Sequence, residues 1–161
     1  MSKFKILTAL IALSFFYACG NKQTSAPGTS GEAPGTKTET STTDYDPKRG
    51  VGKFNESNLT LDAALNVPMA EAGEKASGVK CTSCHKLTEE RLVGPGWKGV
   101  TQRRTPSWIM NFITNPEPMI DKDPELQAQL ELCLVRMPNQ SLTEEDARNI
   151  LEFMRKNDGV K

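Results

Sequence analysis

Two cysteines and the only histidine of the chain stand within five residues, in the run Cys81-Thr82-Ser83-Cys84-His85. A C-x-x-C-H run is the arrangement through which a c-type haem is attached. The two thiols, three positions apart, lie on one turn, where each can form a thioether to a vinyl group of the porphyrin. The histidine that follows can then bind iron from one side of the ring. The run predicts one covalent haem c, attached through Cys81 and Cys84, with His85 as an iron ligand.

Three haem-free alternatives use the same residues. A zinc site usually takes four Cys or His ligands in paired units, but here one pair stands with one His and the distant Cys133. A thioredoxin-like C-x-x-C belongs beside a strand, and no strand pattern precedes Cys81. A structural disulfide is the third alternative, and it leaves His85 unexplained. The flanking sequence favours the haem over all three.

The first 19 residues are predicted to be a lipoprotein-type signal segment. Lys3 and Lys5 form a basic start, and an apolar stretch too short to span a bilayer follows from Ile6 to Ala18. A small residue before Cys19 resembles the bacterial signal in which that cysteine is lipidated. Alternatives are an ordinary secretory signal and an uncleaved anchor. In each case we expect export, and we expect Cys19 to hold the protein to a bacterial membrane on the periplasmic side.

Residues 20–54 are predicted to be a flexible linker that joins this anchor to a single domain at 55–161. The linker consists mainly of Thr, Ser, Gly, Pro, Lys and Glu and has almost no large apolar side chain before Tyr45. Such a composition does not bury enough apolar surface to order the backbone. We therefore expect a disordered tether followed by a small globular domain.

Charge is balanced overall, with 20 basic and 20 acidic residues, but it is distributed unevenly. The charged residues of 80–104 are mostly basic, with only Glu89 and Glu90 opposing them, whereas the chain after 116 is acid-rich. Such a dipole can steer docking to a charged partner. The sequence has no basic stripe with interleaved aromatic residues, which argues against nucleic-acid binding. Cys133, in an apolar run, is expected to be a small buried hydrophobe rather than a reactive thiol.

Helical spacing and cap signals predict an all-α domain. Pro68 is expected to open a helix to Lys80, with an apolar face at Met69, Ala72, Ala76 and Val79. Further helices are predicted from Thr105-Pro106 to just before Asn115-Pro116, from Pro124 to about Leu134, and from Thr143 to about Lys156. No alternating strand pattern occurs.

Over residues 65–157 the sequence resembles the monohaem class I cytochromes c. Gly73, eight residues before the first cysteine, matches the glycine at the family's close crossing of terminal helices. Gly94-Pro95 matches the loop whose proline carbonyl accepts a hydrogen bond from the proximal histidine. Met137-Pro138 matches the ligand-methionine loop before the closing helix. Ser77 departs from the family, which usually has an aromatic residue there; Leu65, Phe153 or the haem is expected to fill that space.

The second iron ligand has two main candidates. Met137 follows a predicted helix, precedes Pro138 and comes directly before the closing helix, as the family's ligand does. Met119 is the rival, in the Pro-rich stretch 115–123. Met110 and Met154 lie on the apolar faces of predicted helices, which are expected to pack in the core. Met69 precedes the C-x-x-C-H run. Trp97 and Trp108, with Ile109 and Leu134, are expected to line the haem pocket.

The resemblance implies an electron carrier rather than an enzyme. Protein ligands on both faces of the iron, His85 and Met137, leave no open position for a substrate. Donor and acceptor proteins are expected to dock transiently at a rim with Lys80, Lys86 and Lys98. One alternative is a dedicated donor to one terminal oxidase or periplasmic reductase. Another, a haem gas sensor or peroxidase, requires that Met137 does not bind the iron.

Overall fold

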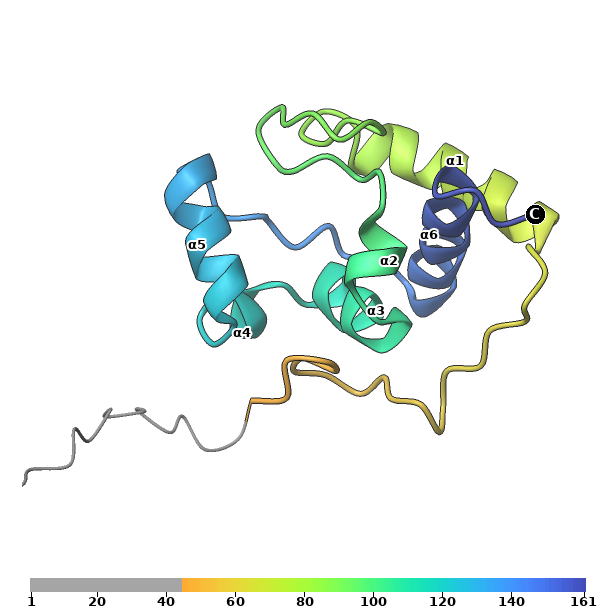
Figure 1. Ribbon diagram of the computed structural model, residues 1–161, viewed down its shortest axis with the longest axis horizontal. Helices are drawn as coiled ribbons and strands as arrows, with labels where there is room; N and C mark the ends of the chain where they lie inside the picture. The colour runs from red at the N-terminus through yellow and green to blue at the C-terminus, as the bar shows by residue number, and fades with distance from the viewer. Residues whose placement is uncertain (1–44) are drawn as a thin grey trace, which may run out of the picture. The chain divides into compact units, whose positions relative to one another are not determined.

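The computed structural model describes residues 45–161, which form an all-helical domain (Figure 1). The predicted signal segment 1–19, with Cys19, and linker residues 20–44 lie outside the described residues. Between 45 and 161 there is no strand, only an isolated bridge between His85 and Arg91, so the all-α prediction is confirmed. The helices are α1 (Val67–Lys80), α2 (Val100–Arg103), α3 (Pro106–Thr114), α4 (Glu117–Ile120), α5 (Pro124–Cys133) and α6 (Glu144–Asn157). None of these helices is long and apolar enough to cross a bilayer.

Helices α1 and α6 pack against each other along a seam of small residues (Figure 1). The buried residues of α1 are Ala70, Gly73 and Ser77. A Cβ atom at Gly73 would overlap the carbonyl of Asn149 and lie 2.8 Å from the backbone nitrogen of Ile150. The predicted close crossing at Gly73 is confirmed.

The predicted apolar face of α1 is wrong. Val79 is 85% exposed and Ala72 is also exposed, whereas Met69 and Ala76 are only half-buried. The helix turns its small residues inward because α6 brings the apolar side chains to this interface, among them Ile150 and Leu151. Ser77 is fully buried, and its hydroxyl donates to the carbonyl of Glu74 at 3.0 Å.

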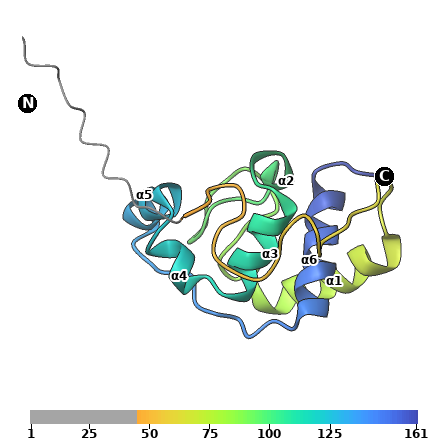
Figure 2. The same cartoon turned by 90° about the horizontal axis from the view of Figure 1, so that it is seen from below.

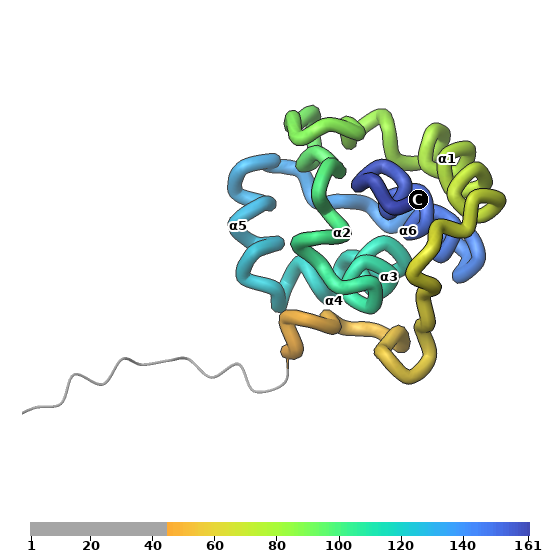
Figure 3. Tube along the Cα trace, turned by 45° about the vertical axis from the view of Figure 1, so that its right-hand side comes forward, coloured from red at the N-terminus to blue at the C-terminus, as the bar shows by residue number. Residues whose placement is uncertain are grey.

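The segment 45–54, predicted to be linker, packs against the domain (Figures 2 and 3). Asn111, buried in α3, donates from Nδ2 to the carbonyls of Arg49 and Phe54 and accepts from the backbone nitrogen of Phe54. Phe54 is itself 7% exposed. The ordered domain therefore begins no later than Tyr45, because one buried amide satisfies the backbone of a segment whose composition alone predicts disorder.

A buried carboxylate joins this segment to α3 and α5. Asp123, 1% exposed, accepts hydrogen bonds from the Tyr45 hydroxyl at 2.5 Å and from Trp108 Nε1 at 3.0 Å. It also caps α5 by accepting from the backbone nitrogens of Glu125 and Leu126. Burial raises the pKa of Asp123, but these hydrogen bonds outweigh burial and hold the pKa below its usual value.

A second buried carboxylate, Glu152 on α6, behaves in the same way. Its side chain accepts from the backbone nitrogen of Asn66 and pairs with Arg148 and Arg155 at 2.6 Å each. Burial again raises the pKa of Glu152, but the hydrogen bonds from Asn66 and the two arginines outweigh it and lower the pKa. Arg155 also donates to the carbonyl of Asp62, so α6 holds the chain just before α1 in place.

We expect these carboxylates to make stability depend on pH on the acid side. Their pKa values are lower in the folded protein than in the unfolded chain, so the unfolded chain binds protons first as pH falls. The stability that these two carboxylates contribute is then fully present above their pKa values in the unfolded chain, which are about 4, and it declines as the pH falls below those values. Asp123→Asn should cost about 1–2 kcal/mol at pH 7, because Tyr45 and Trp108 lose a charged acceptor. Urea unfolding at pH 7 and pH 3 measures both effects, and an equal cost at the two pH values would contradict the assignment.

Candidate functional site

The C-x-x-C-H run forms a helical turn directly after α1. The backbone nitrogens of Cys84 and His85 both donate to the carbonyl of Cys81 at 3.0 Å, and the nitrogen of Cys81 donates to Ser77. Cys81 is 8% exposed and Cys84 is half-buried. Burial, the largest influence, raises the pKa of the Cys81 thiol to about 11. The turn holds both sulfurs and the imidazole on one short segment.

The imidazole of His85 is oriented by the Gly94-Pro95 loop. The Pro95 carbonyl lies 2.8 Å from His85 Nδ1, and since a carbonyl only accepts, Nδ1 carries the proton. A Cβ atom at Gly94 would lie 2.8 Å from Nδ1 and overlap Cε1, so the loop backbone runs against the ring. Burial lowers the pKa of His85, and the hydrogen bond to Pro95 only partly offsets it. The ring is thus a neutral imidazole with the lone pair of Nε2 free to bind a metal.

Trp97 packs against the imidazole ring of His85. The ring centroids of Trp97 and His85 lie 5.8 Å apart, and Trp97 meets Phe153 of α6 edge-on at 6.5 Å. The backbone nitrogen of Trp97 donates to the carbonyl of Lys86, which closes the loop. Trp97 was expected to line the pocket; the structure places it in the layer that positions His85.

An open, mainly apolar cavity lies beside His85. His85, Gly94 and Pro95 form one part of its lining, and Met137 and Pro138 form another. The remaining walls come from the haem run, the loop after it, α3, α4, α5 and the chain after α5: Cys84, Val93, Phe112, Ile120, Leu126, Gln129, Leu130, Cys133, Val135 and Arg136.

The two candidate methionines lie in different surroundings. Met137 is half-buried and lines the cavity together with His85. Met119 is fully buried away from it: a Cβ atom at Gly50 would lie 2.8 Å from the Met119 sulfur, so that side chain packs under the N-terminal segment. Met110 and Met154 are also buried in the core. Met137 is the one methionine in the lining.

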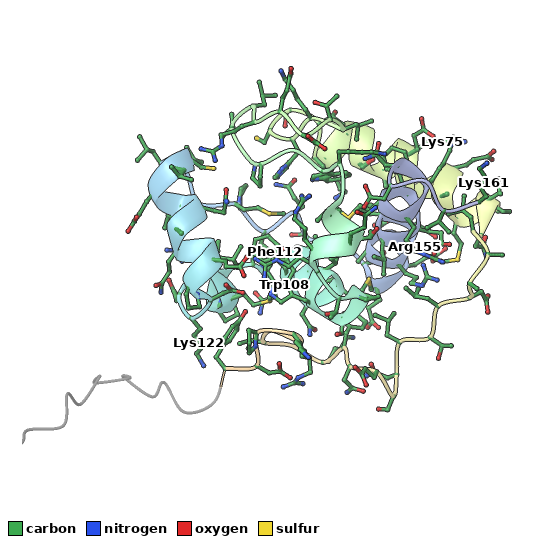
Figure 4. All side chains as sticks on the ribbon, in the orientation of Figure 1. Lys75, Trp108, Phe112, Lys122, Arg155 and Lys161 are labelled. Carbon is green, nitrogen blue, oxygen red and sulfur yellow. The ribbon has the colours of Figure 1, made fainter. Side chains whose placement is uncertain are left out.

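Trp108 stands one layer behind the cavity wall, which corrects the expectation that it lines the pocket. Its ring stacks on Phe112 with centroids 5.0 Å apart, and Phe112 is the residue in the lining (Figure 4). The indole N–H is engaged by Asp123, and the Arg104 guanidinium covers the Trp108 ring at 4.1 Å. The long-range bond to Asp123 draws the indole away from the wall.

Residues after α5 also depart from the expected pocket. Leu134 is 84% exposed, because it ends α5 in the left-handed conformation with φ 58° and does not continue the inward face of the helix. Cys133 is half-buried on the cavity wall rather than in the core, and it forms no disulfide with the other described cysteines, Cys81 and Cys84. These corrections leave Phe112, Leu126 and Leu130 as apolar wall residues.

The three lysines of the expected docking rim are bonded to their own chain. Lys80 donates to the carbonyl of Gln140, and Lys98 donates to the carbonyl of Asn157. Lys86 pairs with Glu90 at 2.7 Å. A docking role for this rim stays a prediction.

A second, polar pocket adjoins the cavity. It shares Pro95 and Gln129 with the cavity lining, and it adds Glu89, Gly96 and three basic residues. We call it the basic pocket, defined by Arg91, Lys98 and Arg103. Sequence reasoning gave Gln129 no role; its place three residues after Leu126, on the inward face of α5, was the available signal.

The arrangement fits a haem. A flat apolar ring suits the apolar walls, a neutral imidazole offers its free nitrogen from one side, and a thioether sulfur shares the lining. Two thiols on the adjoining turn are placed for covalent attachment, and the basic pocket offers partners for carboxylates. Among the described residues no group of three His, Cys, Asp or Glu side chains is placed to hold a metal ion.

Comparisons with known proteins agree with this geometry. The family model described as "Cytochrome c" matches residues 70–158. A solved structure of cytochrome c from Rhodothermus marinus is similar to this chain, with 34% sequence identity, a TM-score of 0.61, and coverage of 65% of this chain and 90% of that chain. An engineered form of that protein is similar at 33% identity and a TM-score of 0.60, with the same coverage. A third structure, of the engineered form bound to a carbene intermediate, is 34% identical with a TM-score of 0.58. No curated protein matches the chain.

Proposed function

Because this chain belongs to the cytochrome c family, whose members transfer electrons, we propose that it is a membrane-tethered carrier of single electrons. The family membership means that the chain binds one haem c covalently through Cys81 and Cys84. The finer proposal is that His85 and Met137 bind the iron from opposite faces. An iron with two protein ligands has no open position, which favours electron exchange over catalysis on a bound substrate.

One observation carries the axial assignment. Met137 lines the same cavity as His85, whereas Met119 is packed under Gly50, outside that lining. A thioether ligand opposite a neutral imidazole raises the reduction potential of a haem. A bound haem would supply the redox change, and the protein would hold the side chains of His85 and Met137 in place.

The remaining residues divide the work of holding the haem. Pro95 fixes the proton of His85 on Nδ1, and Gly94 and Trp97 limit the ring's movement. Phe112, Leu126 and Leu130, which line the cavity, would keep water from the haem. The carboxylates of the haem would pair, in the basic pocket, with Arg91, Lys98 and Arg103.

The cellular setting is also part of the proposal. An N-terminal segment with the anatomy of a lipoprotein signal supports export, lipidation of Cys19 and anchoring on the periplasmic side of a bacterial membrane. Respiratory proteins that dock transiently would then be the electron donor and acceptor. The uneven charge along the chain supports electrostatic steering of those encounters.

The experiment is absorption spectroscopy on the exported full-length protein. We expect haem that remains attached under denaturing conditions, low-spin spectra in both oxidation states, a methionine–iron charge-transfer band and no binding of carbon monoxide. Haem in the membrane fraction of wild type, released in Cys19→Ala, would support the anchor. A high-spin ferrous form that binds carbon monoxide would instead favour the gas sensor or peroxidase.

A further inference from the structure

Gln129 carries a polar atom that the protein itself does not satisfy. Among residues 45–161, its Oε1 is the one buried side-chain nitrogen or oxygen without a hydrogen-bond partner. An unsatisfied buried polar group costs about 1–3 kcal/mol, so native proteins rarely leave one without a partner. This oxygen is buried even though the adjacent cavity is open, whereas Gln129 as a residue lines that cavity, so the group left to reach a molecule held there is the side-chain NH₂.

The place of Gln129 on α5 is well defined. The Asp123 carboxylate caps the start of the helix, and Leu126 is buried one turn before Gln129. Leu126, Leu130 and Cys133 line the cavity from the same face of the helix. Gln129 is thus the only amide on an otherwise apolar wall.

Gln129 also lies at the border of two environments. It belongs to the lining of the apolar cavity and to that of the basic pocket, and Pro95 is the one other residue shared by both. Among residues 45–161, Lys98 and Arg103 each use one donor, to the carbonyls of Asn157 and Lys98, and their other donors form no hydrogen bond there. An apolar ring with attached carboxylates matches this border, with the ring in the cavity and the carboxylates toward the cations.

We propose that the side-chain amide of Gln129 donates a hydrogen bond to a haem carboxylate where the cavity meets the basic pocket. The inference rests on the proposed function, because it requires the haem to occupy the cavity. The NH₂ group of the amide can donate, and a carboxylate can only accept. Gln129 is then a positioning residue that fixes one edge of the haem.

The hydrogen bond should also bear on the redox equilibrium. A carboxylate near the iron stabilises the more positive, oxidised form, and a donor that spreads its charge weakens that preference. Replacing Gln129 by Leu should therefore lower the ratio of reduced to oxidised protein at a fixed potential. The expected change is roughly two- to fivefold, less than the full loss of a hydrogen bond to a charged group, because the carboxylate is present in both oxidation states.

Proton NMR on the reduced, haem-loaded protein tests the contact directly. The side-chain NH₂ resonances that vanish in Gln129→Leu should show Overhauser contacts to the methylene protons of a haem propionate. Gln127→Leu is the matched control, because Gln127 lies on the same helix, is exposed, and donates to the carbonyl of Asp121 at 2.8 Å. That control should leave both the contacts and the redox ratio unchanged.

Contacts from the Gln129 amide to the Met137 methyl group, or only to protein protons, would overturn this inference and leave the proposed function intact. A high-spin ferrous spectrum would overturn the Met137 assignment, and the Gln129 contact would then be measured in the diamagnetic carbon monoxide complex. A preparation without covalent haem would overturn both proposals.

Discussion

Met137→Leu is expected to lose the methionine–iron charge-transfer band and to bind carbon monoxide in the reduced state. Leucine keeps the apolar character of the cavity wall but has no sulfur, so the iron position opposite His85 opens. The reduction potential should fall by on the order of 0.2 V, a fraction of the roughly 0.8 V range over which axial ligands set it. Absorption spectra and a redox titration of the variant measure these changes.

Met119→Leu is the matched control for that experiment. The Met119 side chain is fully buried against the N-terminal segment, and a volume-conserving exchange of Met for Leu usually costs less than about 1.5 kcal/mol. Its spectrum and potential should equal those of wild type. A charge-transfer band that survives in Met137→Leu and disappears in Met119→Leu would reverse the assignment.

Gly73→Ala is expected to cause a large loss of stability. The new Cβ atom would meet the backbone of Asn149 and Ile150 in α6, which cannot turn away as a flexible side chain would. Alanine favours a helix over glycine by about 1 kcal/mol, but the clash reverses this gain. We expect a net loss of about 3 kcal/mol, which is a large part of the free energy of unfolding of a typical protein, about 5–15 kcal/mol.

Gly78→Ala provides the control on the same helix. Gly78 is exposed, and a Cβ atom there would meet nothing within 4 Å. Only the higher helix propensity of alanine over glycine acts at this position, so this variant should be more stable than wild type by about 0.5–1 kcal/mol. Denaturant unfolding of both haem-loaded variants, followed by circular dichroism, gives the two values. A similar change of the same sign in both would mean that the α1–α6 crossing is looser than described.

The parts of this protein that are encoded locally could be predicted from sequence. The C-x-x-C-H turn follows α1 as expected, and Thr105 and Thr143 cap α3 and α6 through their side chains. The start and end of each longer helix lie within two residues of the prediction, because caps and prolines act on their immediate neighbours.

Features that depend on distant partners could not be predicted. The buried face of α1 consists of small residues, which give no hydrophobic period, so the apolar pattern indicated the wrong face. The segment 45–54 is ordered by Asn111, more than 50 residues away. Trp108 is held behind Phe112 by Asp123, and an indole alone gives no hint of whether it faces the cavity or the core.

The pairing of α1 with α6 also bears on when the chain can fold. Residues 67–80 find their partner only in residues 144–157, so the domain cannot close until synthesis has passed the last helix. Closing a loop of this length costs entropy that is repaid only when the helices meet, which delays folding further. A nascent chain that stays open in this way would suit the export proposed above, and the turn with Cys81 and Cys84 would remain accessible for haem attachment until the two helices meet.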